Sequence, residues 1–486
     1  MRKEITCWFS VKYIFVFFVC HCIATTVHAQ IVLQTDFTDS ANAKQIIVYH
    51  LNVFNRITPI NGVNVTNATS KTKLCIVRPL GGIAKKGKAD LTMDSYKWDA
   101  VSKTFYTDFT QLKRQIDGVY DEGLEIHQIV LDNPSWAFQR NAKGALLGDS
   151  LRVSTYGNAE PPKDYNVWAN YLKDVMSFLV DTYGKDEVLK IQFDIGREIG
   201  TPTHWSGTKE QFFEFYKVSV KAIKQELPKA KVGTHFLWGS SQKAWGTNFV
   251  KWCKTNKVHY DFVGVSFYPF YHMENRTNFN QVYLKDFAVI KDIPEWNENA
   301  KLEMHEFALI KSLSKAGNAF ENAPVAHQNS FIIGLMKMFY QNNMYNVFQW
   351  GDGKKYEGAR NMLLTLEGNT YYNSNKSGVQ RSEKNYVDAI FSRDSKQDSY
   401  HIVAYNYSAN LESKDTESLR ITAKLNVPPW TKIMVRSAVY ISKEDAFTWY
   451  EWHEVMTKGN ESSKSMMSFD TQLPVYSFLK YEIKLP

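Results

Sequence analysis

Two glutamates stand at the ends of expected β-strands, where side chains can meet a substrate. Glu198 follows the apolar run 189–195, and Glu306 lies near the end of the run 302–307. If both runs are parallel strands of one barrel, their carboxyl ends share a face, and the two carboxylates could flank one bond. Carboxylates about 5–5.5 Å apart can cleave a glycosidic bond with retention, because one protonates the leaving oxygen while the other attacks the anomeric carbon. The two groups then need different surroundings, which hold their pKa values apart.

A purely structural explanation is the alternative. Glu198 could pair with Arg197 or a neighbouring helix, and Glu306 could simply end a strand. The choice between the two explanations depends on the elements that would position these residues.

The chain between about residues 45 and 350 supplies such elements. Short β-rich runs alternate there with helical patterns, which is typical of parallel strands joined by crossover helices. The expected strands are 46–53, 74–78, 124–131, 189–195, 231–236, 262–267, 302–307 and 345–350. The clearest helical patterns lie over 108–120, 168–183, 210–227 and 330–340. Because eight strands close such a cylinder, we predict a (β/α)8 TIM barrel, an α/β fold whose fourth and seventh strands carry the two glutamates.

The pattern changes after about residue 386. Short alternating runs follow at 401–407, 419–425, 432–440 and 476–485, with polar residues between them and no helical periodicity. This pattern of short strands favours a small all-β sandwich. The predicted organisation is a signal peptide over 1–29, a catalytic barrel over 30–385 and a C-terminal β-sandwich over 386–486.

The N-terminus has the pattern of a secretory signal peptide. Basic residues precede an apolar run over 13–20, and Val27 and Ala29 supply the small residues of a cleavage site. Lipid attachment at Cys20 or Cys22 is the weaker alternative, because the residues before these cysteines are unsuited to it. No later run is long enough to span a membrane. We therefore expect a secreted or periplasmic protein.

The amino-acid composition argues against several classes of protein and ligand. Apolar residues make up 44% and aromatic residues 14% of the 486 residues, which excludes a disordered chain. The formal charge of +8 comes without an arginine-rich block, so we expect no nucleic-acid partner. Outside the leader only Cys75 and Cys253 remain, and no Cys/His cluster has zinc spacing, so no metal or other cofactor is expected. Abundant aromatic rings suit sugar ligands, although they also fill cores.

Several stretches follow one another in a recognisable order. Residues 76–82 read IVRPLGG, residues 131–136 read LDNPSW, and residues 261–269 read DFVGVSFYP. Between the last two lie a strand, a Glu, the stretch HWSGT and a helix. From residue 75 to 352 the chain thereby resembles glycoside hydrolase family 39, retaining clan A enzymes that include β-xylosidases and α-L-iduronidases.

The resemblance implies roles for four residues. Glu198 would be the general acid/base and Glu306 the nucleophile. Tyr268 would donate a hydrogen bond to the nucleophile, and Trp350 would form a platform under the bound sugar. A place in the core is the alternative for Tyr268 and Trp350.

The sequence departs from the family at positions that recognise sugar. Arg197 stands where the family has an Asn that holds the sugar 2-hydroxyl, and Ile199 replaces a Pro. Leu80 and Ser266 replace histidines, and His305 replaces a small polar residue. Sugar specificity therefore does not follow from the resemblance.

Arg197 offers a forked cationic donor that suits sulfate or carboxylate. One hypothesis is that it reads an anionic substituent of the substrate. The alternative is an ion pair with Asp194 or Glu198. Further candidates for sugar contact, near expected loop or strand ends, are Arg78, His127, Asp132, Asn133, Trp136, Trp205, His235 and His305.

We therefore predict a secreted retaining glycoside hydrolase that acts on an oligosaccharide or polysaccharide, with anionic or sulfated glycans among the candidate substrates. A non-catalytic glycan-binding protein on a glycosidase-like barrel and a transglycosylase are the alternatives. The sequence leaves the sugar, the linkage, exo or endo action and the oligomeric state open.

Overall fold

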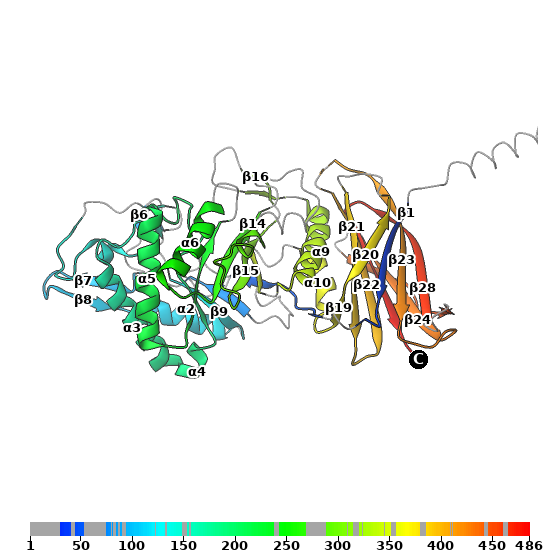
Figure 1. Cartoon of the computed structure of the whole chain (residues 1–486), viewed down its shortest axis with the longest axis horizontal. Coiled ribbons are helices and arrows are strands. Elements are labelled where there is room, and N and C mark those ends of the chain that lie inside the picture. The colour runs from blue at the N-terminus through cyan, green and yellow to red at the C-terminus, as the bar shows by residue number, and fades with distance from the viewer. Residues whose placement is uncertain are drawn as a thin grey trace, which may run out of the picture. The chain divides into compact units, whose positions relative to one another are not determined.

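The protein is described by a computed structural model, in which the chain folds as two compact units (Figure 1). One unit comprises residues 45–368, and the other joins residues 1–44 to residues 369–486. The described residues are 30–39, 44–52, 74–78, 80, 84–85, 88–89, 94–121, 123–131, 134–147, 153–154, 157–237, 243–268, 288–308, 310–313, 320–322, 324–344, 346–350, 356–379, 385–408, 410, 412–441, 446–459 and 465–486.

The first unit is a closed barrel of parallel strands, which confirms the predicted fold class. In chain order the strands are β3 (His50–Asn52), β4 (Leu74–Val77), β9 (Glu125–Val130), β12 (Gln192–Asp194), β13 (Lys231–Phe236), β14 (Phe262–Phe267), β15 (Lys301–Phe307) and β18 (Val347–Trp350). The cylinder closes because β3 pairs in parallel with both β4 and β18. Glu198 follows the fourth strand, and Glu306 lies on the seventh.

The barrel strands are buried on both faces, which explains why their sequences read as nearly continuous apolar runs. The expected strands 231–236 and 262–267 coincide with β13 and β14. Strand β12 is shorter than expected, because the backbone before it bonds back to the short helix α4 (Lys185–Val188), as in the 3.1 Å bond from Ile191 N to Val188 O.

Helices connect the strands. They are α2 (Thr110–Asp121), α3 (Tyr165–Tyr183), α5 (Lys209–Glu226), α6 (Lys243–Asn256), α9 (Val325–Gln341) and α10 (Glu357–Leu364), with 3-10 turns η2 (Trp136–Gln139) and η4 (Ala288–Ile290). Helix α5 begins with a capping box, in which Thr208 and Gln211 exchange side-chain and backbone bonds. Helices α3 and α5 pack together, with Trp168 Nε1 donating to Ser219 Oγ at 2.7 Å.

Small hairpins interrupt this pattern. They pair β5 (Ala84–Lys85) with β6 (Lys88–Ala89), β7 (Tyr96–Asp99) with β8 (Thr104–Thr107), β10 (Val153–Ser154) with β11 (Gly157–Asn158), and β16 (Ile310–Leu313) with β17 (Phe320–Asn322).

The second unit contains two facing sheets. The smaller sheet has the order β20 (Ser374–Gly378), β1 (Gln30–Asp36), β23 (Thr416–Leu425), β28 (Ser465–Pro474) and β27 (Lys458–Gly459). The larger has the order β2 (Lys44–Gln45), β19 (Thr370–Tyr372), β21 (Asn385–Asp394), β22 (Ser399–Ser408), β29 (Ser477–Lys484), β24 (Lys432–Ile441) and β25 (Ala446–Trp449), with β26 (His453–Met456) also on β24. Side chains of both sheets share one apolar core, as in a sandwich.

The N-terminal strand belongs to this sandwich and not to the barrel. Strand β1 pairs in parallel with β23 and antiparallel with β20, and Ile31 and Leu33 lie in the sandwich core. The expected barrel range 30–385 thus differs from the compact units at both ends, since β19 and β20 also join the sandwich before residue 386. Alternation in β1 indicates a half-buried strand, but it does not indicate which distant strand is its partner.

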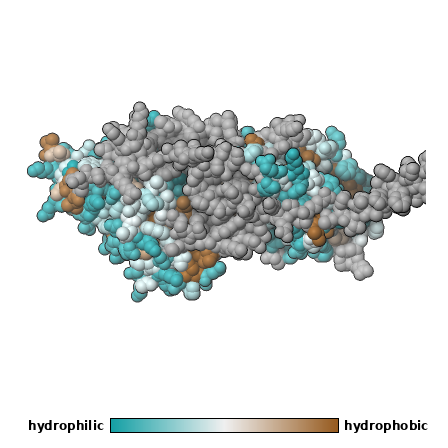
Figure 2. Space-filling view, turned by 90° about the horizontal axis from the view of Figure 1, so that it is seen from above, coloured by the Kyte–Doolittle hydropathy of each residue, from teal (hydrophilic) through white to brown (hydrophobic). Residues whose placement is uncertain are grey.

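The surface is mostly hydrophilic where Figure 2 colours it, as expected when apolar side chains lie in the cores. Hydrophobic residues form small, separate patches on the face shown there. Among the described residues, we find no helix with the length and apolarity needed to cross a membrane. The expected signal peptide lies outside the described residues.

The placement of β1 gives a stability prediction. Leu33→Ala should destabilise the sandwich by about 2–5 kcal/mol, because it leaves a cavity in a fully buried position. Gln34→Ala, at the adjacent exposed position, should change stability by less than about 0.5 kcal/mol. Differential scanning calorimetry with both variants tests this, and equal unfolding temperatures would place β1 outside the folded core.

Candidate active site

Glu198 lies on a tight turn that follows β12. The turn is fixed to the neighbouring strand, because Ile195 N donates to Gly233 O at 2.8 Å and Ile199 N donates to His235 O at 2.9 Å. Glu198 itself has a φ of 45°, a left-handed conformation that is uncommon for a glutamate. Such strain persists where the surroundings impose it, often at functional sites.

A β-bulge positions Glu306. In the pairing of β14 with β15, Val265 lies opposite Met304 and Ser266 lies opposite Glu306, so His305 is an extra residue on the seventh strand. A bulge re-aims the side chains that follow it. Glu306 thereby meets side chains from the turn after β12 and from the end of β14.

Arg197 and Tyr268 hold the Glu306 carboxylate from two sides. The Arg197 guanidinium donates to Oε1, with Nε at 2.6 Å, and the Tyr268 hydroxyl donates to Oε2. The side chains of Arg197 and Glu306 are 2% and 1% exposed. Arg197, which precedes Glu198 in the chain, therefore binds the carboxylate of Glu306 directly.

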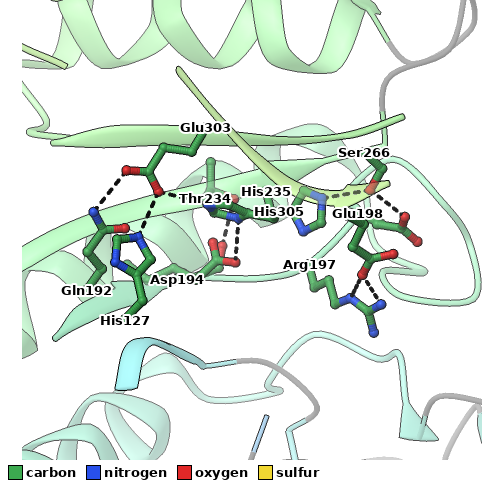
Figure 3. Close-up of polar contacts among 12 residues, drawn as sticks. His127, Gln192, Asp194, Arg197, Glu198, Thr234, His235, Ser266, Glu303 and His305 are labelled. Atoms are coloured by element: carbon green, nitrogen blue, oxygen red, sulfur yellow. Dashed lines mark hydrogen bonds and ion pairs between the residues drawn. The ribbon is translucent and has the colours of Figure 1, made fainter. Parts of the chain in front are cut away.

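Glu198 has a different set of partners. Ser266 Oγ donates to its Oε1 at 2.7 Å, and His204 Nε2 lies 3.2 Å from its Oε2. Behind Ser266, His235 Nε2 lies 2.8 Å from the serine oxygen (Figure 3). Since the single hydroxyl proton of Ser266 goes to Glu198, its oxygen accepts from His235, which assigns the proton of His235 to Nε2.

These surroundings separate the two pKa values. Burial raises the pKa of Glu306 to about 7, with help from the charge of Glu198 and against Arg197 and Tyr268. Burial also opposes ionisation of Glu198, but the His204 hydrogen bond and nearby positive charge outweigh it, so the pKa of Glu198 is lowered. The two pKa values are therefore held apart, but in the direction opposite to the implied roles, since the raised pKa belongs to the implied nucleophile and the lowered pKa to the implied acid.

A second polar cluster fills the barrel interior. Glu303 accepts hydrogen bonds from Gln192 at 3.1 Å and Asn346 at 2.5 Å, and it also contacts His127 at 3.2 Å and His305 at 3.1 Å. Figure 3 shows a continuous row of polar side chains that runs from this cluster through Asp194, His305 and His235 to Ser266 and Glu198.

His305 is held between two carboxylates in this row. Its Nδ1 lies 3.7 Å from Asp194, and its Nε2 contacts Glu303. Burial lowers the pKa of His305, but these two partners outweigh burial and raise it to about 9, so the ring carries a proton at neutral pH. Ligand atoms of Asp194, His235 and His305 lie within 4.8 Å of one another, so these residues could hold a metal ion. The contacts of His305 favour an ion-paired imidazolium there instead.

Trp350 contacts Tyr268, whose hydroxyl donates to the candidate nucleophile. Its half-buried indole makes an edge-to-face contact with the Tyr268 ring, with centroids 6.1 Å apart. Arg78 is buried at the end of β4, and its charge lowers the pKa of His204.

Other sequence-based candidates lie elsewhere. Trp205 packs in the core against Phe212 and Phe215 and donates to Thr208 O, so its indole is not placed to contact a sugar. His305 is fully buried in the barrel interior, which likewise removes it from the expected sugar-binding set.

Of the remaining candidates, the described residues Trp136 and His127 show no contact with Glu198 or Glu306. Trp136 lies in η2, where the Arg140 guanidinium sits 5.9 Å from its ring centre. His127 belongs to the Glu303 cluster. Asp132 and Asn133 lie outside the described residues.

Sequence reasoning missed His204 and Glu303. His204 belongs to the stretch HWSGT, which carried no predicted role for it. Its position six residues after Glu198, with Gly200 between them, is compatible with a turn that returns to the carboxylate. Glu303 sits mid-strand, where an acidic residue in an apolar run signals a buried polar partner.

Comparison with known proteins decides the family. The sequence profile of glycosyl hydrolases family 39 matches residues 83–301. An alpha-1,4-L-rhamnosidase of Formosa agariphila is 66% identical over 459 residues, which cover 94% of each chain. The chain belongs to glycosyl hydrolases family 39. This glycoside hydrolase is also 31% identical over 166 residues to a beta-xylosidase of Geobacillus stearothermophilus, which covers 34% of this chain and 31% of that one.

Solved family 39 structures share the fold. The enzyme from Xanthomonas axonopodis pv. citri aligns with a TM-score of 0.63 at 12% identity, covering 95% of this chain and 98% of that one. A monomeric beta-xylosidase from Caulobacter crescentus CB15 aligns with a TM-score of 0.62 at 14% identity, covering 93% and 99%. At these identities the likeness establishes the fold alone.

The barrel interior gives a second prediction. A Cβ at Gly264 on β14 would overlap the His305 ring, so Gly264→Ala should destabilise the protein by about 1–3 kcal/mol. The same substitution in a His305→Ala background should cost much less. Urea unfolding of the four proteins of this double-mutant cycle measures the coupling, and additive effects would contradict the contact.

Proposed function

We propose that this glycoside hydrolase is exported and cleaves α-1,4-linked L-rhamnosyl bonds with retention of configuration. The substrate assignment is supported by the 66% identity to the Formosa agariphila alpha-1,4-L-rhamnosidase, which extends over nearly the whole of both chains. Export is supported by the signal-peptide pattern at the N-terminus.

The observation that carries the mechanism is the arrangement of two buried carboxylates from the fourth and seventh strands. Glu306 attacks the anomeric carbon and forms a glycosyl–enzyme ester, while Glu198 gives a proton to the leaving oxygen. Water then attacks the anomeric carbon of this ester, and Glu198 takes a proton from that water. Glu306 leaves as a carboxylate, and the enzyme returns to its starting state.

Arg197 and Tyr268 prepare Glu306 for attack. Two N–H groups of Arg197 donate to Oε1 and the Tyr268 hydroxyl donates to Oε2, which fixes the plane of the group. The guanidinium charge favours the ionised, nucleophilic form against the cost of burial. Arg197 is thus a partner of the nucleophile, and its contact with Glu306 does not support the hypothesis that it reads an anionic substituent.

The aromatic corner formed by Tyr268 and Trp350 suits the proposed sugar. L-Rhamnose is a 6-deoxy sugar, so it presents a methyl group and C–H bonds that pack well on aromatic rings. An anionic or sulfated group on neighbouring sugars stays a separate prediction. Activity on a panel of neutral, uronic and sulfated glycans tests it, and turnover of neutral glycans only would contradict it.

A glycan-binding protein without turnover is the second candidate. The lowered pKa of Glu198 favours it, because a carboxyl that stays ionised cannot protonate a leaving oxygen. The following substitutions distinguish the two candidates.

Glu306→Gln should reduce turnover of an aryl α-L-rhamnoside by about four orders of magnitude or more, because it removes the nucleophile. Glycan affinity measured by calorimetry should change little. A wild-type protein that binds the same glycans without releasing sugar would favour the binding candidate instead.

Glu198→Gln should spare the first step for an aryl glycoside with an activated leaving group, since that group leaves without protonation. With an oligosaccharide substrate the rate should fall by about 10²–10⁴-fold. Equal losses on both substrates would contradict the acid/base role.

The pH dependence of kcat/KM tests the role of Arg197. The rate should rise with pH through about 7, as Glu306 becomes ionised. Arg197→Met removes a charge that lowers this pKa, so the rise should move to higher pH. Arg197→Lys keeps the charge and should move it less, whereas unchanged profiles in both variants would exclude electrostatic control by Arg197.

A further inference from the structure

A short backbone segment brings His204 back to Glu198. Thr201 N donates to Glu198 O at 3.1 Å, and His204 N donates to Thr201 O at 2.9 Å. Gly200, with a φ of 101°, supplies a conformation that a side chain would strain. Both ends of the contact are therefore fixed by the same turn.

His204 is almost fully enclosed at this contact. Its side chain is 1% exposed and that of Glu198 is 11% exposed, and the joined atoms are His204 Nε2 and Glu198 Oε2 at 3.2 Å. The other carboxylate oxygen already accepts from Ser266, which is oriented by His235. Bulk water therefore has little access to the carboxyl, and the imidazole is its titratable hydrogen-bond partner.

We propose that His204 and Glu198 hold one exchangeable proton between them, and that His204 is a positioning residue that stores this proton for the leaving oxygen. The inference rests on the acid/base role proposed above for Glu198. It explains how a carboxyl with several donors around it still supplies a proton.

The charges that face the pair act on its proton in opposite directions. Arg197 and Arg78 are the neighbouring cations and lower the pKa of His204, whereas Glu198 raises it. Glu306, the partner of Tyr268, is itself paired with Arg197. His235, whose pKa is lowered well below its ordinary value, adds no charge at neutral pH. Burial lowers the pKa of His204 more than Glu198 raises it, so this pKa lies below its ordinary value and the pair holds its proton on the acid side of neutral pH. Proton binding by either partner depends on the other.

The proton balance closes over one catalytic cycle. In the first step a proton passes from His204 Nε2 to Glu198, and Glu198 gives a proton to the leaving oxygen, so the sugar–oxygen bond breaks as the ester to Glu306 forms. In the second step Glu198 takes a proton from the attacking water and returns it to His204 Nε2. Ser266 and His235 keep their protons throughout and hold the carboxylate in place.

Nuclear magnetic resonance tests the shared proton without turnover. In protein labelled with nitrogen-15 histidine, the His204 ring signals are assigned by their loss in His204→Gln. We expect the pKa of His204 to fall by about one to three units in Glu198→Gln, since the carboxylate stabilises the imidazolium. An unchanged titration would overturn the proposal, even if the enzyme is active. A shifted titration in a protein that shows no turnover would support the pair and refute the proposed function.

Kinetics provides a second test. His204→Gln should lower kcat for a rhamnosyl oligosaccharide by about tenfold or more but spare an activated aryl rhamnoside within about threefold. The falling, alkaline limb of kcat/KM for the oligosaccharide should shift in His204→Gln. Equal losses on both substrates, or an unchanged pH profile, would show that His204 is only structural.

A matched substitution controls for general effects of losing a histidine. The side chain of His259 is half-exposed, and its ring contacts Asp261 at 2.8 Å rather than Glu198 or Glu306. His259→Gln should leave both activities and the pH profile unchanged. If His204→Gln does not fold, the titration of His204 in Glu198→Gln still decides the question.

Discussion

The ion pair between Arg197 and Glu306 is the contact on which the arrangement of the site depends. Both side chains are buried, and burial of two charges is costly unless good geometry and hydrogen bonds compensate. Here the compensation comes from the guanidinium and from Tyr268. Because Arg197 immediately precedes Glu198, this contact connects both carboxylates through one peptide unit. A displacement of Glu306 on β15 would therefore act directly on the turn after β12 that carries Glu198.

Much of the fold could be predicted from the sequence because of how parallel barrels bury their strands. Strands such as β13 and β14 have no solvent-facing side, so they read as apolar runs between helical patterns. The sequence did not indicate that residues 30–36 pair with the sandwich, because their partner strand β23 lies almost 400 residues away in the chain. Local alternation predicts a strand, but only tertiary packing selects its sheet.

The site was predicted in part for a similar reason. Strand ends locate Glu198, Glu306 and Tyr268, since topology alone brings those positions to one face. Sequence does not give the direction of a side chain, so the choice between a substrate contact and an ion pair stayed open for Arg197, whose guanidinium donates to Glu306. His305 was misplaced because the bulge that redirects the seventh strand depends on backbone pairing.

The inclusion of β1 in the sandwich affects the order in which the protein can mature. The strand is synthesised before the barrel strands, yet its neighbours β20 and β23 follow more than 330 residues later. The barrel, as an uninterrupted segment, can acquire its structure while the sandwich still lacks most of its chain. The sandwich can therefore be completed only after the last strands are synthesised, and until then β1 presents unpaired backbone groups with which another chain can pair.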